Sequence, residues 1–223
     1  MNIWILTLFP KIFDSVFSQS IIKKAQRGNL VNIKIVNIRD FSQDLRKTAD
    51  DKPYGGGRGM ILKVDVVARA LEAIKPKPYS ILLSASGKKY DQKKAKALLL
   101  EKDLAIICGH YEGIDFRVEK FVDEILSIGD FVLSGGEIAA MALVDSVVRL
   151  IPKVIHKDSL SIESFSSFNL QNLLEYPQYT RPEVFRNLRV PPILLSGDHQ
   201  KIAKWRKQEA LKRTKKYRPD LLK

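Results

Sequence analysis

The sequence predicts an α/β domain, in which a parallel sheet carries helices on both faces, followed by a small helical C-terminal domain. Short apolar segments typical of buried strands alternate with longer segments whose apolar residues recur at helical spacing. Because this alternation places successive strands in parallel, helices are needed to cover the sheet. The 223 residues, 45% of them apolar, suffice for one large domain or for one mid-sized domain with a small appendage.

The predicted elements of the sheet domain follow one another along the first 152 residues. Strands are expected at residues 3–9, 31–35, 81–83, 104–108 and 124–128. Helices are expected at residues 14–27, 64–74, 91–102 and 137–150. Gly28 stops the first helix, Asp91 is suited to N-cap the third, and Pro152 closes the last.

The composition changes after residue 155. Residues 156–172 are rich in Ser and Asn and show no sustained period, so we expect a flexible linker there. Residues 173–223 are expected to form the small helical domain, with a basic helix at residues 200–215. The chain is therefore divided into a sheet domain at residues 1–155, the linker, and the C-terminal domain.

Positive charge is concentrated at the C-terminus. The chain carries a net charge of +13, and residues 199–223 contribute +8 through ten Lys or Arg against two Asp or Glu. So dense a run favours a polyanionic partner over a merely solvated face. Trp205 and Tyr217 interleave the charges without a broad apolar face, which favours a nucleic acid over an anionic membrane.

Several classes of protein are excluded by what the sequence lacks. The single cysteine, Cys108, rules out a disulfide framework and a cysteine-based zinc site, and suits a cytoplasmic location. No basic leader is seen, and the longest strongly apolar stretch, residues 138–144, is too short to span a membrane. Three scattered histidines, with no phosphate loop, dinucleotide fingerprint or nucleophile elbow, argue against metal hydrolases, kinases and serine hydrolases.

Three glycine-rich turns are the remaining candidates for a site. Residues 109–115 and 129–136 follow predicted strands, and residues 55–59 contain four glycines. Open α/β sheets bind ligands at the carboxyl ends of their strands. Each turn alone could simply require positive φ, whereas the three together favour a backbone that approaches a ligand closely.

Four segments resemble the signature motifs of the bacterial tRNA (guanine-N1)-methyltransferase family and occur in the family's order. They are Pro53-Tyr-Gly-Gly-Gly-Arg-Gly-Met60, Cys108-Gly-His-Tyr-Glu-Gly-Ile-Asp115, Ser127-Ile-Gly-Asp-Phe-Val-Leu-Ser-Gly-Gly-Glu137 and Tyr176-Pro-Gln-Tyr-Thr-Arg-Pro182. The resemblance implies a homodimeric S-adenosylmethionine-dependent enzyme of the SPOUT class, whose sheet contains a deep trefoil knot. It implies methyl transfer to N1 of the guanosine 3′ of the tRNA anticodon, position 37, with S-adenosylhomocysteine as product. A magnesium requirement stays open.

The resemblance also implies which residues form the sites. The cofactor would bind in the sheet domain, at Leu83, Ser84, Gly109, Ile128, Gly129, Asp130, Phe131, Val132, Leu133, Gly135 and Gly136. The anticodon stem-loop would lie against the basic helix, at Lys201, Lys204, Arg206, Lys207, Lys212, Arg213, Lys215 and Lys216. Tyr111 or the glycine-rich loop that contains Gly59 would hold the flipped target base.

The reaction requires a base for the N1 proton and a group that stabilises negative charge on the guanine oxygen O6. Arg149 matches the family arginine for the second role. The family's aspartate before Ser-Phe is best matched by Glu163, which keeps the carboxylate on a longer arm. A second register aligns Ser166-Ser-Phe168 and leaves no carboxylate there, and Asp158 is a further candidate.

Two other classes of function compete with this interpretation. The altered linker is compatible with a non-catalytic RNA-binding protein on a degenerate SPOUT scaffold. The basic tail alone is compatible with a helical DNA-binding module fused to a small-molecule sensor. Binding and turnover of S-adenosylmethionine distinguish these two alternatives from the methyltransferase. The degenerate scaffold would bind the cofactor without turnover, and the sensor is not expected to bind it.

Overall fold

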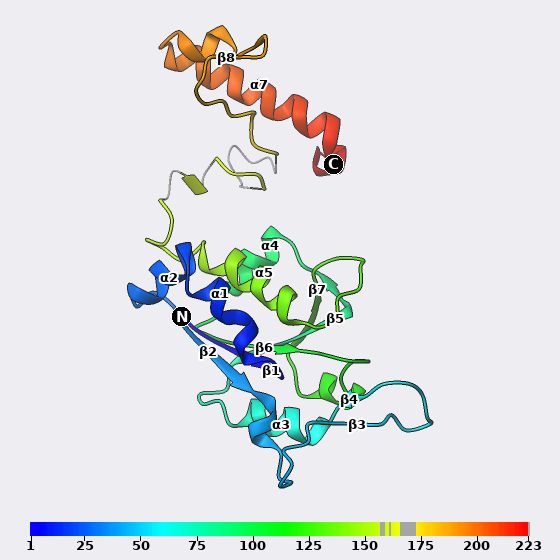
Figure 1. Cartoon of the computed structure of the whole chain (residues 1–223). Coiled ribbons are helices and arrows are strands. Elements are labelled where there is room, and N and C mark those ends of the chain that lie inside the picture. The colour runs from blue at the N-terminus through cyan, green and yellow to red at the C-terminus, as the bar shows by residue number, and fades with distance from the viewer. Residues whose placement is uncertain (157–158, 161, 166–172, 223) are drawn as a thin grey trace. The chain divides into compact units, whose positions relative to one another are not determined.

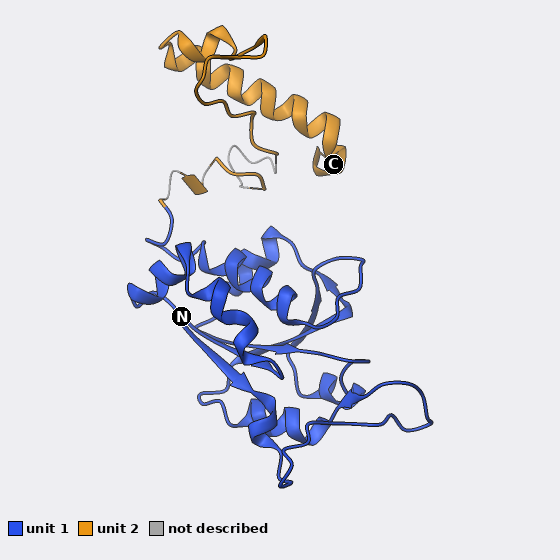
Figure 2. Cartoon of the chain, in the orientation of Figure 1, with its two compact units in different colours: residues 1–155 blue, residues 156–223 orange. Residues whose placement is uncertain are grey.

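The computed structural model describes residues 1–156, 159–160, 162–165 and 173–222 (Figure 1). The chain forms two compact units, residues 1–155 and 156–223 (Figure 2). Asp158 and residues 166–172 of the predicted linker lie outside the described residues. Within the described residues, none of the helices is both long enough and apolar enough to span a membrane.

The first unit is built on a five-stranded sheet with the strand order β2-β1-β6-β5-β7. Its strands are β1 (Asn2–Thr7), β2 (Asn32–Asn37), β5 (Tyr79–Lys89), β6 (Asp103–Cys108) and β7 (Glu124–Ser127). All neighbouring strands are parallel, and Ile5 of β1 pairs with Ile35 on one side and Ile106 on the other. The predicted parallel α/β class is confirmed, while the trefoil knot stays a prediction.

Helices cover both faces of this sheet (Figure 1). Because side chains alternate along a strand, β1 sends Ile3 and Ile5 into one core and Trp4 and Leu6 into the other. The first core is covered by α1 (Asp14–Phe17), α2 (Ser20–Arg27), α4 (Gln92–Leu98) and α5 (Glu137–Val148), and the second by α3 (Val64–Glu72). Both faces are therefore buried, as predicted.

Helices α3 and α5 each end two residues before their predicted ends at residues 74 and 150, and two other predicted helices differ more strongly. The helix predicted at residues 14–27 is broken, because α1 ends at Phe17 and Ser20 adopts a φ of +50°. Phe17 and Ile22 are both buried in the same core. The helix predicted at residues 91–102 ends at Leu98, although its N-cap is confirmed, since the Asp91 carboxylate accepts from the Lys94 N–H at 2.8 Å.

Strand β5 extends beyond its predicted end at residue 83, with an irregularity in its pairing. Leu83 and Lys88 both lie opposite Leu126 of β7, so residues 84–87 bulge out of the ladder. Short elements that the sequence did not predict lie in the connections between the strands of the sheet. They are η1 (Pro10–Phe13), η2 (Ile38–Phe41), β3 (Asp50–Asp51), β4 (Ile61–Leu62) and η3 (Phe116–Lys120).

The second unit contains one long helix, α7 (His199–Tyr217), where the basic helix was predicted. The Asp198 side chain caps it by accepting from the Lys201 N–H at 3.0 Å. Ile202, Ala210 and Thr214 are buried on its inner side. The unit also holds a hairpin of β8 (Val184–Phe185) and β9 (Leu188–Arg189), and two short helices, η5 (Pro192–Leu195) and η6 (Pro219–Leu222).

Candidate active site

A cavity of about 330 Å³ lies at the carboxyl ends of β5, β6 and β7. Three chain segments form most of its wall, namely residues 82–85, residues 109–116, and residues 126–136 without Asp130. Parallel α/β sheets bind their ligands at this edge, and the volume suits a small molecule. The β5 bulge, the turn after β6 and the turn after β7 therefore form a single site.

The structure brings together ten of the eleven predicted cofactor residues. Those that line the cavity are Leu83, Ser84, Gly109, Ile128, Gly129, Phe131, Val132, Leu133, Gly135 and Gly136. Asp130 is not in the wall; it is exposed, with its carboxylate 3.5 Å from the Lys89 ammonium. That these residues bind the cofactor stays a prediction.

The two turns behind β6 and β7 are joined through their backbones at Gly136. Its N–H donates to the carbonyl of Gly109 at 2.7 Å. A Cβ added at Gly136 would lie 2.8 Å from the Cα of Cys108, which real Cβ atoms essentially never do. A glycine is therefore required here, because a side chain would push the two turns apart.

A buried carboxylate that the sequence analysis did not single out lies beside these turns. Glu137, only 3% exposed, begins α5, where the helix dipole favours a negative charge. Its Oε1 accepts from the Thr7 hydroxyl at 2.8 Å, and its Oε2 lies 3.5 Å from Nδ1 of His110. The only sequence signal for Glu137 and His110 was that they lie within the quoted motifs.

Cys108 is unsuited to be a nucleophile. Burial in the core, together with the nearby Glu137 charge, raises the pKa of its thiol well above the usual range. The thiol therefore stays protonated at neutral pH, and nucleophilic cysteine chemistry requires the thiolate. The chemistry of this site has to come from other groups.

Tyr111 lies on the rim of the cavity in a constrained turn. Its φ is +58°, a conformation that costs a non-glycine residue on the order of 1 kcal/mol. The turn is closed by the Gly113 N–H, which donates to the His110 carbonyl at 3.0 Å. Tyr111 is 44% exposed, so its ring is accessible to a ligand.

The glycine-rich loop is attached to the same turn. Strands β3 and β4 flank the loop, and the Glu112 N–H donates to the Met60 carbonyl at 3.1 Å. Gly59 adopts a φ of +81°, and a Cβ added there would lie 2.3 Å from the Glu112 side chain. The structure thus brings Gly59 and Tyr111, the two predicted target-base residues, onto neighbouring segments.

Three carboxylates, those of Glu112, Asp115 and Glu119, line the cavity. Hydrogen bonds from the Arg117 side chain lower the pKa of Asp115, so this group is charged at neutral pH. Within the described ranges, no group of three or more His, Cys, Asp or Glu residues could hold a metal ion. Because Asp115 forms an ion pair with Arg117 at 2.7 Å, the negative charge of the wall comes mainly from Glu112 and Glu119, which favour a ligand that carries positive charge.

The two predicted catalytic residues belong to different units. Arg149 caps the C-terminus of α5 in the first unit and is half-buried. Glu163 is half-buried in the second unit. Asp158, the alternative base, and Ser166-Ser-Phe168 of the alternative register lie outside the described residues. The catalytic roles of Glu163 and Arg149 stay predictions.

The predicted tRNA-binding residues of α7 are exposed, with one exception. The exposed ones are Lys201, Lys204, Arg206, Lys207, Lys212, Lys215 and Lys216. Arg213 is half-buried, and its Nε is buried without a hydrogen-bond partner among the described residues. The Arg206 guanidinium lies 4.8 Å from the centre of the Tyr176 ring, a cation–π contact that holds it in place.

The parallel α/β sheet, with its cavity bounded by glycine turns at the carboxyl edge, agrees with the SPOUT class of methyltransferases whose motifs the sequence resembles. A model of the tRNA (Guanine-1)-methyltransferase TrmD family matches residues 1–223. A tRNA (guanine-N(1)-)-methyltransferase of Carboxydothermus hydrogenoformans is 52% identical over 226 residues, covering all of this chain and 88% of that protein. The protein of the same name from Geobacillus kaustophilus is 52% identical over 228 residues, covering all of this chain and 91% of its own. The chain therefore belongs to the tRNA (Guanine-1)-methyltransferase family, and it is an enzyme.

Proposed function

We propose that this enzyme transfers a methyl group from S-adenosylmethionine to N1 of the guanosine immediately 3′ of the anticodon, position 37, in tRNA. The observation that carries the proposal is the cavity at the carboxyl edge of the sheet, which gathers the turns that the family motifs contain. Family membership supports methylation of guanine in tRNA.

The cavity suits S-adenosylmethionine in both shape and charge. Leu83, Ile128 and Leu133 offer apolar surface for an adenine ring, and the glycine turns present backbone groups for its polar edge. The acidic residues of the wall suit a ligand with a net positive charge. When bound, S-adenosylmethionine supplies an electrophilic methyl group on its sulfonium.

Proton transfer and charge stabilisation are assigned to two residues of the chain. Glu163 accepts the proton of guanine N1 as that nitrogen attacks the methyl group. Arg149 stabilises the negative charge that develops on the guanine oxygen O6. Glu163 is preferred over a serine at this point of the linker, because a hydroxyl needs its own base before it can accept a proton.

The tRNA is bound by both units in this proposal. The exposed lysines and arginines of α7 contact phosphates of the anticodon stem-loop without reading sequence. Tyr111 and the glycine-rich loop with Gly59 receive the guanine after it leaves its stack. Docking therefore lies in the second unit, and base recognition lies in the first.

A second copy of the chain is the expected protein partner. Phe116, Phe131 and Val132 line the mouth of the cavity and are 72%, 56% and 91% exposed. Apolar side chains exposed together in this way favour a protein interface, and the family resemblance implies a homodimer. The dimer would cover these side chains and complete the site.

The proposal is tested with the full chain and unmodified tRNA. Transfer of labelled methyl groups from S-adenosylmethionine should occur, and it should be lost on a tRNA in which adenosine replaces the guanosine at position 37. Cofactor binding is measured separately by calorimetry. Cofactor binding without methyl transfer to tRNA, or absence of cofactor binding, would contradict the proposal.

A further inference from the structure

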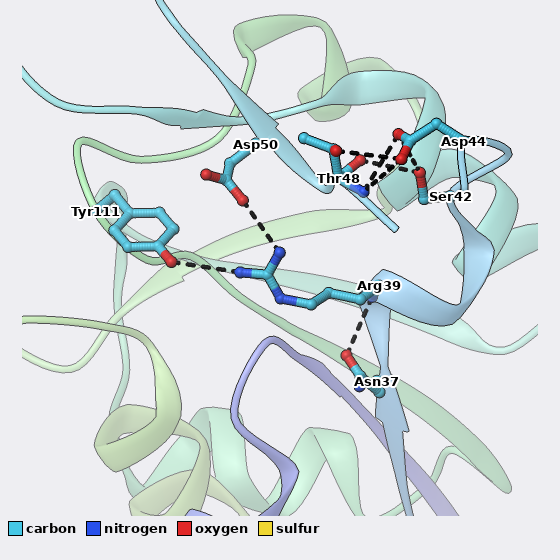
Figure 3. A network of polar contacts seen from close by, with 7 residues as sticks. All are labelled: Asn37, Arg39, Ser42, Asp44, Thr48, Asp50 and Tyr111. Carbon is cyan, nitrogen blue, oxygen red and sulfur yellow. Dashed lines mark hydrogen bonds and ion pairs between the residues drawn. The ribbon is translucent and has the colours of Figure 1, made fainter. Parts of the chain in front are cut away.

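Arg39 makes contacts to two separate segments of the candidate site (Figure 3). Its Nη1 lies 3.4 Å from the carboxylate Oδ1 of Asp50, and its Nη2 donates to the Tyr111 hydroxyl at 3.4 Å. Asp50 begins β3, the strand that leads into the glycine-rich loop. Tyr111 lies on the cavity rim. One guanidinium therefore joins both segments that are expected to hold the target base.

The backbone of Arg39 is held firmly on both sides. Before it, the Asn37 side chain accepts from the Arg39 N–H at 3.1 Å and caps η2 (Figure 3). After it, the Arg69 side chain donates to the Phe41 carbonyl at 2.8 Å, and Ile38 is fully buried. A side chain that starts from an ordered backbone loses less conformational entropy when it bridges two partners.

The surroundings of the Arg39–Asp50 ion pair also favour a defined geometry. The Arg39 side chain is 33% exposed and that of Asp50 only 15%, so solvent screens this ion pair less than one on an open surface. A guanidinium has several N–H donors in a planar fork and can serve two acceptors at once, whereas a lysine ammonium is a single point of charge. Arginine is thus the residue type suited to this bridge.

We propose that Arg39 is a positioning residue that sets the spacing between the Tyr111 turn and the glycine-rich loop. The inference rests on the proposed function, in which these two segments receive the guanine. Without the guanidinium, the Tyr111 side chain loses the contact that fixes its hydroxyl, and the entrance to the loop at Asp50 loses its cation. The target base then meets a wider and less ordered subsite.

The test compares Arg39→Met, which keeps an apolar stem, with Arg39→Lys and with the charge-matched control Arg27→Met at the exposed end of α2. We expect Arg39→Met to lower the single-turnover methylation rate at saturating tRNA about tenfold, the value of one lost charged hydrogen bond. The Kd for S-adenosylmethionine should stay within twofold. Arg39→Lys should recover part of the rate, and Arg27→Met should retain all of it.

Limited proteolysis reports on the order of the glycine-rich loop without requiring methyl transfer. Trypsin can cleave after Arg58, which is exposed in the glycine-rich loop, and this cleavage should be several-fold faster in Arg39→Met than in Arg27→Met. Tyr111→Phe removes only the hydroxyl that Arg39 contacts, and it replaces Arg39→Met as the test variant if Arg39→Met proves unstable. Combined with Arg39→Met, it should add little further loss of rate, because both changes break the same contact.

The two possible failures are distinguishable. If the parent protein neither binds S-adenosylmethionine nor methylates tRNA, the proposed function itself is wrong. If the parent is active but Arg39→Met and Tyr111→Phe keep the parental rate and the parental rate of cleavage after Arg58, the positioning role of Arg39 is wrong. An Arg39→Met effect on cofactor Kd alone would also overturn it.

Discussion

The two units of this protein differ in the kind of ligand-binding surface that they present. In the first unit, a hydrophobic core lies on each face of the five-stranded sheet, between the strands and the covering helices. Its cavity is bounded by backbone turns with fixed spacing. The second unit buries only Ile202, Ala210 and Thr214 among its described residues, and α7 exposes its cations. Ligand binding by the first unit should therefore depend mainly on the shape of the cavity, and ligand binding by the second unit on its positive charge.

This difference has a physical basis. A cavity that encloses a small molecule needs atoms placed to within a fraction of an ångström, which requires a close-packed core behind it. Contacts to phosphates act over several ångströms and tolerate flexible lysine side chains. Substitutions in the first unit should thus affect binding by changing the shape of the cavity. Substitutions in α7 should instead change how strongly tRNA binding depends on ionic strength.

The largest effect is expected where chemistry itself is removed. Glu163→Gln keeps the size and hydrogen-bonding capacity of the side chain but cannot accept a proton. Single-turnover methylation should fall by roughly 10²–10⁴-fold, while the Kd values for cofactor and tRNA stay near parental. Quenched-flow measurement of labelled methyl transfer checks this.

Asp158→Asn is the matched control and should cost little. The opposite result, with full rate in Glu163→Gln and a large loss in Asp158→Asn, would assign the base to Asp158. It would also show that Glu163 does not correspond to the family's aspartate.

The charge of the second unit should give the next largest effect. Replacing Lys207, Lys215 and Lys216 together by Gln should weaken tRNA binding roughly 100-fold at 0.1 M salt. The slope of log Kd against log salt should fall by about two to three, because three phosphate contacts no longer release counterions. Filter binding over a salt series measures both quantities.

Lysines on the first unit provide the control for this prediction. The matched triple replacement uses exposed residues of the sheet unit, Lys11, Lys23 and Lys24. It should leave the slope nearly parental. Equal losses from the two triple variants would mean that net charge alone attracts tRNA and that α7 has no special role.

Shape in the first unit is tested at Gly109. An added Cβ there would lie 3.4 Å from Cγ1 of Ile114 and 4.0 Å from the Leu83 carbonyl, so the two further methyl groups of a valine must enter the cavity. Gly109→Val should weaken S-adenosylmethionine binding tenfold or more by calorimetry, because those methyl groups occupy ligand space.

Gly109→Ala adds only the Cβ, whose nearest neighbours lie 3.4–4.0 Å away, and should weaken S-adenosylmethionine binding less than threefold. Binding of tRNA to either variant should keep its parental salt slope. A Gly109→Val protein that folds normally and binds the cofactor like the parent would contradict the assignment of the cavity.

The smallest effect is expected at a residue that stabilises the first unit without facing either ligand. Asp91→Ala removes the side-chain cap of α4 and should cost about 1 kcal/mol, lowering Tm by about 2–4 °C. Asp91→Asn keeps an acceptor and should cost only a few tenths of that. Methylation at 25 °C should be unchanged in both, and a loss of rate would mean that α4 is coupled to the site.

The successes and errors of sequence-based prediction have local causes. The N-cap at Asp91 and the first strand follow from side-chain chemistry and apolar pattern within a few residues. The cap is confirmed, and the strand predicted at residues 3–9 is observed at Asn2–Thr7. The break at Ser20 was missed because residues 14–27 contain no proline or glycine. The chain breaks the helix so that Phe17 and Ile22 can enter one core, a requirement that no local pattern displays.

The sequence by itself determined the α/β class, the family and the concentration of cations in α7, because each of these depends on residues close together in the chain. Only the tertiary structure decided that the β5 bulge and the turns after β6 and β7 share one cavity. It alone placed Glu137 against Thr7, and Arg39 between Asp50 and Tyr111. Such contacts join residues up to 130 positions apart, and only the packing of parallel strands brings them within hydrogen-bonding distance.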